Sequence, residues 1–361
     1  MTRTWIGPDD IEALGIGCAV LGTGGGGDVG SSVLAAQDSI RRYGNVALVR
    51  PSDLPADGIV MPMSIIGAPT AGMEILGSGD EPAQLRQEVE KATGRKVVAV
   101  MAAEIGGANG VSPVGWASRL GLPLLDADGI GRAFPELQMI SMNVAGISPG
   151  TLFLTDAIGN VGSLVTVSPE WSERWARAVC IASGANAVMA DYLMTPGEAA
   201  RATVQGTVSQ ALSLGRIVQN SQDPITELIA ELSAVALISG KIVDVDRTTR
   251  DGFIRGTITV EGLGNDHGRR IEVQVQNEYL LAIEGPALLA SVPDLITIFD
   301  TATSMPIATE SLRYGQRITV LAWPSDPVWR TAAGLATAGP AAFGYKHSFT
   351  PVEEQHADSI R

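Results

Sequence analysis

The sequence predicts two domains, an α/β domain with a largely parallel sheet over residues 1–168 and a β-rich α+β domain over residues 169–361. The chain has 361 residues, whereas single hydrophobic cores stop growing at about 250 to 300 residues. Strand and helix patterns alternate through the first half, as in a parallel sheet with helical connections. In the second half, strands follow one another with a turn roughly every 8 to 12 residues, which is typical of antiparallel sheets.

The composition restricts the class of protein. Charged residues make up 18% of the chain, against roughly 25% in an average globular protein, so the interior is large relative to the charged surface. The formal net charge of −14 disfavours nucleic-acid binding, which requires clustered Lys and Arg. The sequence has no apolar run of about 18 residues and no apolar leader. We therefore expect a cytoplasmic protein that binds neither nucleic acid nor membranes.

The first half begins with two helices separated by glycines. The segment 8–10 caps a helix in which apolar residues recur every three or four positions from Ile11 to Leu21. A second helix extends from Val33 to the terminating Gly44. Predicted strands then cover residues 46–49, 59–63, 97–103, 122–125, 152–155 and 163–167. Predicted helices cover residues 82–93 and 112–120, and a loop covers residues 126–136.

The second half begins with a helix capped by Ser168 and Pro169. Two long helical patterns cover residues 196–219 and 224–238. Predicted strands follow over residues 241–246, 252–260, 270–275, 279–283, 295–299 and 317–322. We expect these strands to form an antiparallel layer with the helices attached to it.

The glycine run from Gly22 to Gly27 formally matches the GxGxxG dinucleotide fingerprint. A helix precedes it instead of a buried strand, and no Lys follows it, so neither a dinucleotide site nor a P-loop fits. The remaining interpretation is a nest in which the backbone amides of Gly24, Gly25, Gly26 and Gly27 face an anion or a polarised carbonyl oxygen. The alternative is a tight turn between two helices.

Glu104 and Asn109 lie on a glycine-rich turn that directly follows the apolar strand 97–103. In open α/β sheets, ligands bind outside the carboxyl ends of the strands. The two side chains are therefore candidates for substrate contact. The alternative is an ordinary strand-to-helix turn with a solvated Glu and a capping Asn.

A second acidic turn, DADGIGRAFPE, follows the next strand. Asp126, Asp128 and Glu136 could together hold a divalent ion or transfer protons if their pKa values are raised. Arg132 could instead neutralise these carboxylates in a structural network. An exposed loop is the third interpretation.

Other motifs give weaker indications of function. Gly146 to Gly150 fits the GxSxG nucleophile elbow, but Pro149 follows the Ser and lacks the N–H that would donate to an oxyanion. Asn277 and Glu278 interrupt two strands, where turn formation is favoured over a role as lid residues. The two cysteines and three histidines are too scattered for a local metal motif.

Several strings together resemble one family. They are LGTGGGGD (21–28), EIGGANG (104–110), DADGIGRAFPE (126–136), GKIVDVDRTTRDGFIRGTITVEGL (240–263), QNEYL (276–280), VPDLITIFD (292–300), TESLRYGQRITVL (309–321) and GPAAFGY (339–345). The combination is similar to the S-methyl-thiohydantoin desulfurase-like family, over residues 5 to about 352. That resemblance implies an N-terminal desulfurase domain and a separate C-terminal domain. It also implies removal of a thiol from a thiohydantoin or S-methyl-thiohydantoin ring to give a hydantoin.

Our site assignment for that reaction is inferred from the residues above. The expected catalytic residues are Asp126, Asp128 and Glu104, and the expected substrate-binding residues are Gly24, Gly25, Gly26, Gly27, Asn109, Arg132 and Glu136. Asp126 or Asp128 would activate water directly or through a divalent metal held by these two carboxylates, although the sequence requires no cofactor. The glycine amides would stabilise negative charge on the ring.

Two alternatives stay open. The chain could be a noncatalytic subunit of a hydantoinase- or oxoprolinase-like complex, because members of the family often accompany such subunits. It could also hydrolyse a cyclic amide, such as a hydantoin or lactam, without sulfur chemistry. The expected partners are a small cyclic amide or thioamide substrate, a second copy of the chain in a homo-oligomer, and in the first alternative a hydantoinase-like protein.

Overall fold

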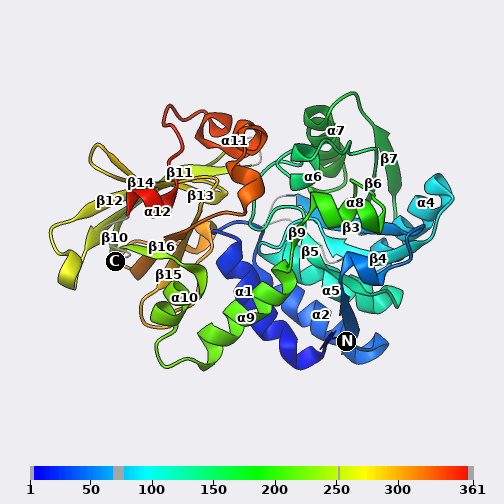
Figure 1. Ribbon diagram of the computed structural model, residues 1–361, viewed down its shortest axis with the longest axis horizontal. Helices are drawn as coiled ribbons and strands as arrows, with labels where there is room; N and C mark the ends of the chain where they lie inside the picture. Colours follow the sequence, from blue (N-terminus) through cyan, green and yellow to red (C-terminus); the bar gives the residue numbers. More distant parts are fainter. Residues whose placement is uncertain (1–3, 68–76, 251–252, 357–361) are drawn as a thin grey trace.

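The computed structural model describes residues 4–67, 77–250 and 253–356. They form two β-sheets with helices packed around them, and the two sheets lie side by side along the long axis of the molecule (Figure 1). The first sheet is parallel at its centre and carries helices, and the second is antiparallel. The predicted fold class is therefore confirmed.

The first sheet has nine strands in the order β1-β2-β5-β4-β3-β8-β6-β7, with β9 paired to β5. Strands β2, β5, β4 and β3 run parallel to their neighbours in this series, whereas β1, β8, β6, β7 and β9 pair antiparallel. The strands are β1 (Thr4–Ile6), β2 (Val46–Val49), β3 (Ile59–Gly67), β4 (Val97–Ala102), β5 (Leu124–Asp128), β6 (Thr151–Thr155), β7 (Val161–Val165), β8 (Asn186–Ala190) and β9 (Val204–Gln205).

Helices connect and cover these strands. They are α1 (Ile11–Leu21), α2 (Val29–Tyr43), α4 (Glu81–Thr93), α5 (Ala108–Leu120), α6 (Ser141–Val144), α7 (Pro169–Ala182), α8 (Pro196–Ala202) and α9 (Thr207–Asn220). Helices α1, α2, α5 and α9 lie together on one side of the sheet (Figure 1). Strands β3, β4 and β5 follow one another through α4 and α5, which is the usual way to connect parallel strands.

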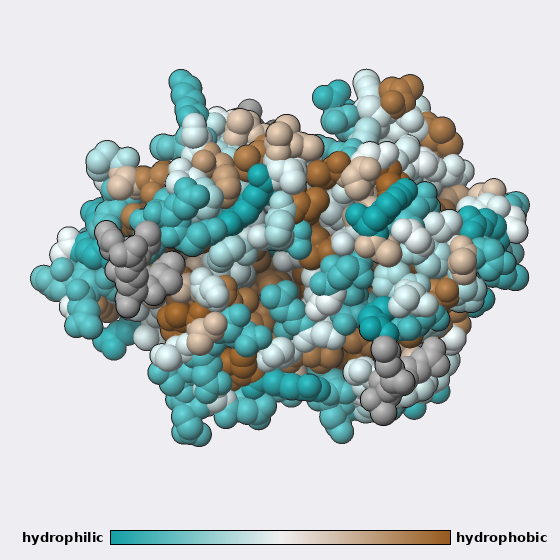
Figure 2. Space-filling view, in the orientation of Figure 1, coloured by the Kyte–Doolittle hydropathy of each residue, from teal (hydrophilic) through white to brown (hydrophobic). Residues whose placement is uncertain are grey.

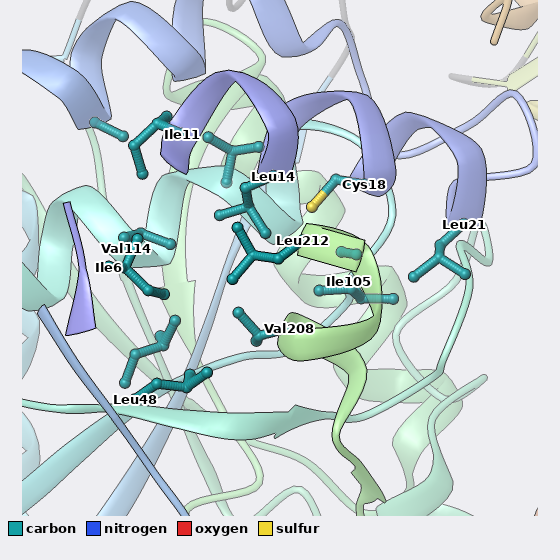
Figure 3. Close-up of a cluster of buried hydrophobic side chains, with 14 of the residues drawn as sticks. Ile6, Ile11, Leu14, Cys18, Leu21, Leu48, Ile105, Val114, Val208 and Leu212 are labelled. Carbon is teal, nitrogen blue, oxygen red and sulfur yellow. The ribbon is translucent and has the colours of Figure 1, made fainter. Parts of the chain in front are cut away.

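Helices α1 and α9 cross at very short range. A Cβ atom on Gly17 would lie 1.7 Å from the Ala211 carbonyl oxygen, and one on Gly215 would lie 1.7 Å from the Ala13 carbonyl oxygen. Glycine is therefore required at both positions for the backbones to touch. Below this crossing, Leu14 of α1 and Leu212 of α9 pack in the same buried apolar cluster as strand and α5 residues (Figure 3).

The second sheet has seven antiparallel strands in the order β14-β13-β12-β11-β10-β16-β15. The strands are β10 (Val235–Arg250), β11 (Phe253–Gly262), β12 (Arg270–Gln276), β13 (Glu278–Glu284), β14 (Ala287–Ser291), β15 (Leu295–Asp300) and β16 (Arg317–Trp323). The helices of this part are α10 (Pro224–Leu232), α11 (Ala332–Ala338) and α12 (Val352–Gln355). Thr297 of β15 donates its hydroxyl to the Val20 carbonyl oxygen at 2.9 Å, so the second sheet contacts α1 directly.

Most predicted elements of the first half are present, and several boundaries differ. The helix predicted over residues 196–219 is wrong, because β9 and Gly206, at φ +79°, divide it into α8 and α9. The helix predicted over residues 224–238 ends at Leu232, and residues 235–238 already belong to β10. The predicted loop 126–136 begins inside β5, because its first three residues continue that strand. Strand β8 was not predicted.

The chain returns to the first sheet after residue 168. Strand β8 pairs with β3 and β6, and β9 pairs with β5. The last strand of the first sheet ends at Gln205 and the first strand of the second sheet begins at Val235. The chain therefore passes from the first sheet to the second between Gln205 and Val235.

Two features concern the surface. Within the part of the chain that the structure describes, no helix is long and apolar enough to cross a membrane. Exposed apolar side chains gather at the end of the molecule formed by α7 and β7, where Figure 2 shows brown patches. They include Val165, Val167, Trp171 and Trp175.

Candidate functional site

A cavity of about 610 Å³ lies at the carboxyl ends of β3 and β4. The amino-terminal ends of α2 and α5 form one wall, β8 contributes another, and the start of β13 reaches in from the second sheet. This is the edge of an open α/β sheet at which ligands usually bind.

The wall at the two helix ends is built from two glycine turns pressed backbone to backbone. A Cβ on Gly26, at φ +79°, would lie 2.3 Å from the Gly106 carbonyl oxygen, and one on Gly107, at φ +58°, would lie 2.4 Å from the Gly26 carbonyl carbon. The Ala108 N–H donates to the Gly27 carbonyl oxygen at 3.2 Å. The turns therefore bring the positive ends of two helix dipoles to the same cavity, where they favour negative charge.

Glu104 follows β4 and lines this cavity, although its side chain is only 7% exposed. Its Oε2 accepts a hydrogen bond from the Phe134 N–H at 3.1 Å, and its Oε1 accepts one from Asn109 Nδ2 at 3.1 Å. Burial raises the pKa of Glu104 from 4.5 to about 7, against the lowering effect of these two donors. A carboxyl with this pKa can accept or give a proton near neutral pH.

Asn109, in the first turn of α5, holds Glu104 in place. While its Nδ2 donates to Glu104, its Oδ1 accepts the Ile65 N–H of β3 at 2.8 Å. The amide is thereby fixed between two neighbouring strand ends. Asn109 lines the cavity, and its side-chain contacts orient the carboxyl group of Glu104.

Arg132 lies behind the cavity wall and is fully buried. Its guanidinium donates to the carbonyl oxygens of Pro293 and Asp294, each at 2.8 Å, and to Thr23 Oγ1 at 3.0 Å. It also lies over the Phe134 ring, 4.6 Å from the centroid. Burial lowers the pKa of Arg132 to about 10, so it remains charged. Arg132 thus joins the two sheets and places a cation behind the acidic residues.

The structure does not bring Asp126 to the cavity. Its Oδ1 accepts the Ser209 N–H at 3.0 Å and its Oδ2 accepts the Ser209 hydroxyl at 2.6 Å. Ser209 lies in the first turn of α9, whose preceding residue Gly206 donates its N–H to the Asp126 carbonyl oxygen at 2.7 Å. Asp126 therefore caps α9 from a neighbouring strand.

Asp128 is fully buried and organises the chain around it. Its Oδ2 accepts the N–H groups of Ile105, Ile130 and Gly131 at 2.8 to 2.9 Å. Burial raises the pKa of Asp128 to about 7. The oxygens of both aspartates thus already accept hydrogen bonds, which is not the arrangement of a metal site. Among the described residues, no three His, Cys, Asp or Glu side chains lie together in a group suited to a metal ion.

The four glycines of the predicted nest divide between two surroundings. Gly26 and Gly27 line the cavity. Gly25 donates its N–H to the Gly22 carbonyl oxygen at 2.8 Å, and the Gly24 carbonyl oxygen accepts the Thr309 N–H of the second half at 2.9 Å. Gly24 therefore supports the contact between the two halves of the chain, and the Gly25 N–H closes the glycine turn itself.

Glu136 lines the cavity, and its carboxylate accepts a hydrogen bond from the Gln138 side-chain amide. Sequence reasoning also missed three cavity residues. Asp191 follows the unpredicted strand β8; it is buried, and burial raises its pKa to about 7. Glu278 and its neighbour Asn277 also line the cavity, although the sequence favoured a plain turn there. In the sequence, Glu278 could have been recognised as a candidate site residue because it is a titratable residue between two apolar strands.

The arrangement combines a buried carboxyl group with a pKa near neutrality and two helix ends that favour negative charge. Such a site can deprotonate water and stabilise an anion that forms on a bound molecule. Its volume lies in the range typical of sites for small molecules, about 300 to 1,000 Å³.

Comparison with known proteins gives matches over nearly the whole chain. Residues 9–166 match the S-Me-THD-like N-terminal domain, and residues 167–352 match the S-Me-THD-like C-terminal domain. A crystal structure of a protein from Chromobacterium violaceum is similar over 97% of this chain and 100% of its own, with a TM-score of 0.81 and 25% sequence identity. No curated protein matches the chain.

Proposed function

Because this chain belongs to the S-Me-THD-like family, we propose that its cavity hydrolyses an S-substituted thiohydantoin ring and releases a thiol. The expected substrate class is the thiohydantoin or S-methyl-thiohydantoin named by the family. The cavity has room for a five-membered ring and a substituent, since its volume is about 610 Å³.

In this reaction, water attacks the ring carbon that carries sulfur. The oxygen of water forms a bond to that carbon, and the carbon–sulfur bond breaks. One proton of water stays with the product, on the ring nitrogen of the hydantoin, and the other leaves with the sulfur as a thiol. The step is a hydrolysis, so it requires no oxidant or reductant.

Glu104 is the group that we assign as the base. Its carboxyl group lines the cavity, and Asn109 and the Phe134 N–H fix its two oxygens. Its pKa of about 7 matches the requirement for a base near neutral pH, where such a group contributes a factor of about 10² to 10⁴ in rate. Negative charge on the ring would lie near the amino-terminal ends of α2 and α5.

The observation that carries this proposal is the position of Glu104 at the cavity. Asp126 and Asp128 are committed to the hydrogen bonds described above, so we transfer the role of base from them to Glu104. The amino-terminal ends of α2 and α5, which reach the cavity at Gly27 and Ala108, would take the role expected of the whole glycine nest.

The test is turnover of an S-methyl-thiohydantoin by the full chain in water labelled with ¹⁸O. We expect methanethiol, detected with a thiol reagent, and a hydantoin that carries one labelled oxygen by mass spectrometry. A ring-opened product without thiol release would identify a cyclic amide hydrolase instead. No turnover of thiohydantoins or cyclic amides by pure protein, together with binding to a hydantoinase-like subunit, would favour the noncatalytic alternative.

A further inference from the structure

Glu278, the first residue of β13, brings a second carboxyl group to the cavity from the other sheet. Its side chain is 2% exposed and lines the cavity. Among the described residues, no hydrogen-bond donor lies within reach of its buried Oε2 atom. An ionised carboxylate with such a bare oxygen would lose hydration without compensation, whereas the neutral acid loses far less.

The charges around Glu278 also favour the neutral acid. Glu104 and Glu310 oppose its ionisation, and Arg132 favours it. The guanidinium of Arg132 donates its hydrogen bonds to carbonyl and hydroxyl oxygens and none to Glu278, and its favourable charge is outweighed by burial and by Glu104. Burial first, and the charge of Glu104 second, raise the pKa of Glu278 well above its usual value.

The backbone on both sides holds this carboxyl group in place. A Cβ on Gly25 would lie 2.2 Å from Glu278 Oε1, so the side chain packs directly against the glycine loop. Asn277, at φ +58°, accepts the Ile254 N–H on its Oδ1 at 2.8 Å. Tyr279 donates its N–H to the Thr23 carbonyl oxygen at 2.8 Å. Glu278 is therefore fixed between the two domains and is not a mobile turn residue.

We propose that Glu278 and Glu104 form a carboxyl pair that holds one proton, in which Glu278 is the acid that protonates the departing sulfur. The assignment rests on the proposed hydrolysis for its leaving group. The pair itself rests on the cavity that both side chains line and on the charge of Glu104 acting on Glu278. It makes the active site a joint product of both domains, because the base follows β4 and the acid begins β13.

The protons balance over one turnover. Glu104 accepts a proton from water as the new carbon–oxygen bond forms, and Glu278 gives its proton to sulfur as the carbon–sulfur bond breaks. The thiol leaves, and Glu104 then carries the proton while Glu278 is ionised. Transfer of that proton from Glu104 to Glu278, directly or through water, restores the starting state.

The test compares two leaving groups. Methanethiolate is strongly basic and needs protonation as it leaves, whereas 4-nitrothiophenolate leaves as the anion. We expect Glu278→Gln to lower kcat/KM for the S-methyl substrate by about 10² to 10⁴, and for the S-(4-nitrophenyl) substrate by less than about tenfold. Glu104→Gln should lower both to a similar extent. Equal losses for both substrates in Glu278→Gln would overturn the acid role.

A second measurement does not depend on turnover. A buried protonated carboxyl group has its own infrared band, and the difference spectrum of wild type minus Glu278→Gln at pH 7 should contain one such band, in addition to any from Asp128 and Asp191 that both proteins share. An unchanged spectrum would overturn the protonated state of Glu278. If the wild type releases no thiol but the band is present, the hydrolysis fails while the pair stands.

Two further variants serve as references. Glu272→Gln, on the exposed face of β12, removes a carboxyl group from the same sheet and should leave both substrates and the infrared band unchanged. Glu278→Asp retains an acid at a shorter reach, and it should restore part of the S-methyl activity lost in Glu278→Gln.

Discussion

The turns after β4 and β5 resemble each other in sequence but have different roles in the structure. Each places carboxylates beside glycines at the end of a neighbouring strand. After β4, Glu104 lines a cavity and accepts two hydrogen bonds. At the end of β5, Asp128 accepts three backbone N–H groups in the interior and Asp126 caps α9. The hydrogen-bond partners of a strand-end carboxylate therefore determine its role, because a carboxylate whose oxygens already accept several hydrogen bonds has little capacity left for a ligand.

The largest expected effect is on Glu104. Glu104→Gln keeps the shape of the side chain but cannot accept a proton, so kcat/KM for thiol release should fall by about 10² to 10⁴. The free energy of unfolding should change by about 1 kcal/mol or less, because one of the two hydrogen bonds is retained. Steady-state kinetics and urea denaturation measure the two quantities. Turnover at the wild-type rate would remove Glu104 from the catalytic role.

The next effect is a pH dependence that the β4 turn should impose on the rate. The pKa of Glu104 is about 7, and only the ionised form can accept a proton. The rate should therefore fall as the pH is lowered, by about fiftyfold in kcat/KM from pH 7 to pH 5 for a single group of this pKa. A pH–rate profile checks this. A flat profile between pH 5 and 7 would contradict the assignment of the base.

The β5 turn should respond in stability. Asp128→Asn replaces a carboxylate oxygen by an amide in a pocket of backbone donors, which should lower the free energy of unfolding by about 1 to 3 kcal/mol. Denaturant titration measures the loss, and turnover per folded molecule should stay within a few-fold of wild type. A loss of turnover as large as that of Glu104→Gln, with stability intact, would return Asp128 to the catalytic set.

The smallest effect concerns the cap of α9. Asp126→Ala removes the acceptor of the Ser209 N–H and hydroxyl, and loss of a cap costs about 0.5 to 2 kcal/mol. Thermal unfolding monitored by circular dichroism would show the lower Tm. Ser209→Ala removes the hydroxyl but not the N–H, so it should cost less than Asp126→Ala. Equal costs would show that the helix cap contributes nothing.

The sequence was a good guide where local signals agree. The glycine after Leu21 and the terminating Gly44 locate the ends of α1 and α2, since glycines act on the nearest turn. The start of α2 was predicted at Val33, whereas the capping Asp28 begins the helix at Val29. Prediction from the sequence failed where pairing with a strand distant in the chain determines the local structure. The pattern over residues 196–219 favours one helix, but pairing of β9 with β5 breaks it. Strand β8 is short and depends on β3 and β6 for its hydrogen bonds.

Residue patterns were enough to predict the α/β and β-rich halves, the family resemblance, and the placement of acidic residues on glycine turns at strand ends. Which of these acids reaches the cavity depends on the tertiary structure. This depends on contacts between residues far apart in the chain. Asp126 accepts a hydrogen bond from Ser209, and Asp128 accepts hydrogen bonds from the backbone N–H groups of Ile105 and Gly131. Glu278, from the other sheet, packs against Gly25. Burial and charge at such contacts set the pKa of each group, and neither is encoded in the local sequence.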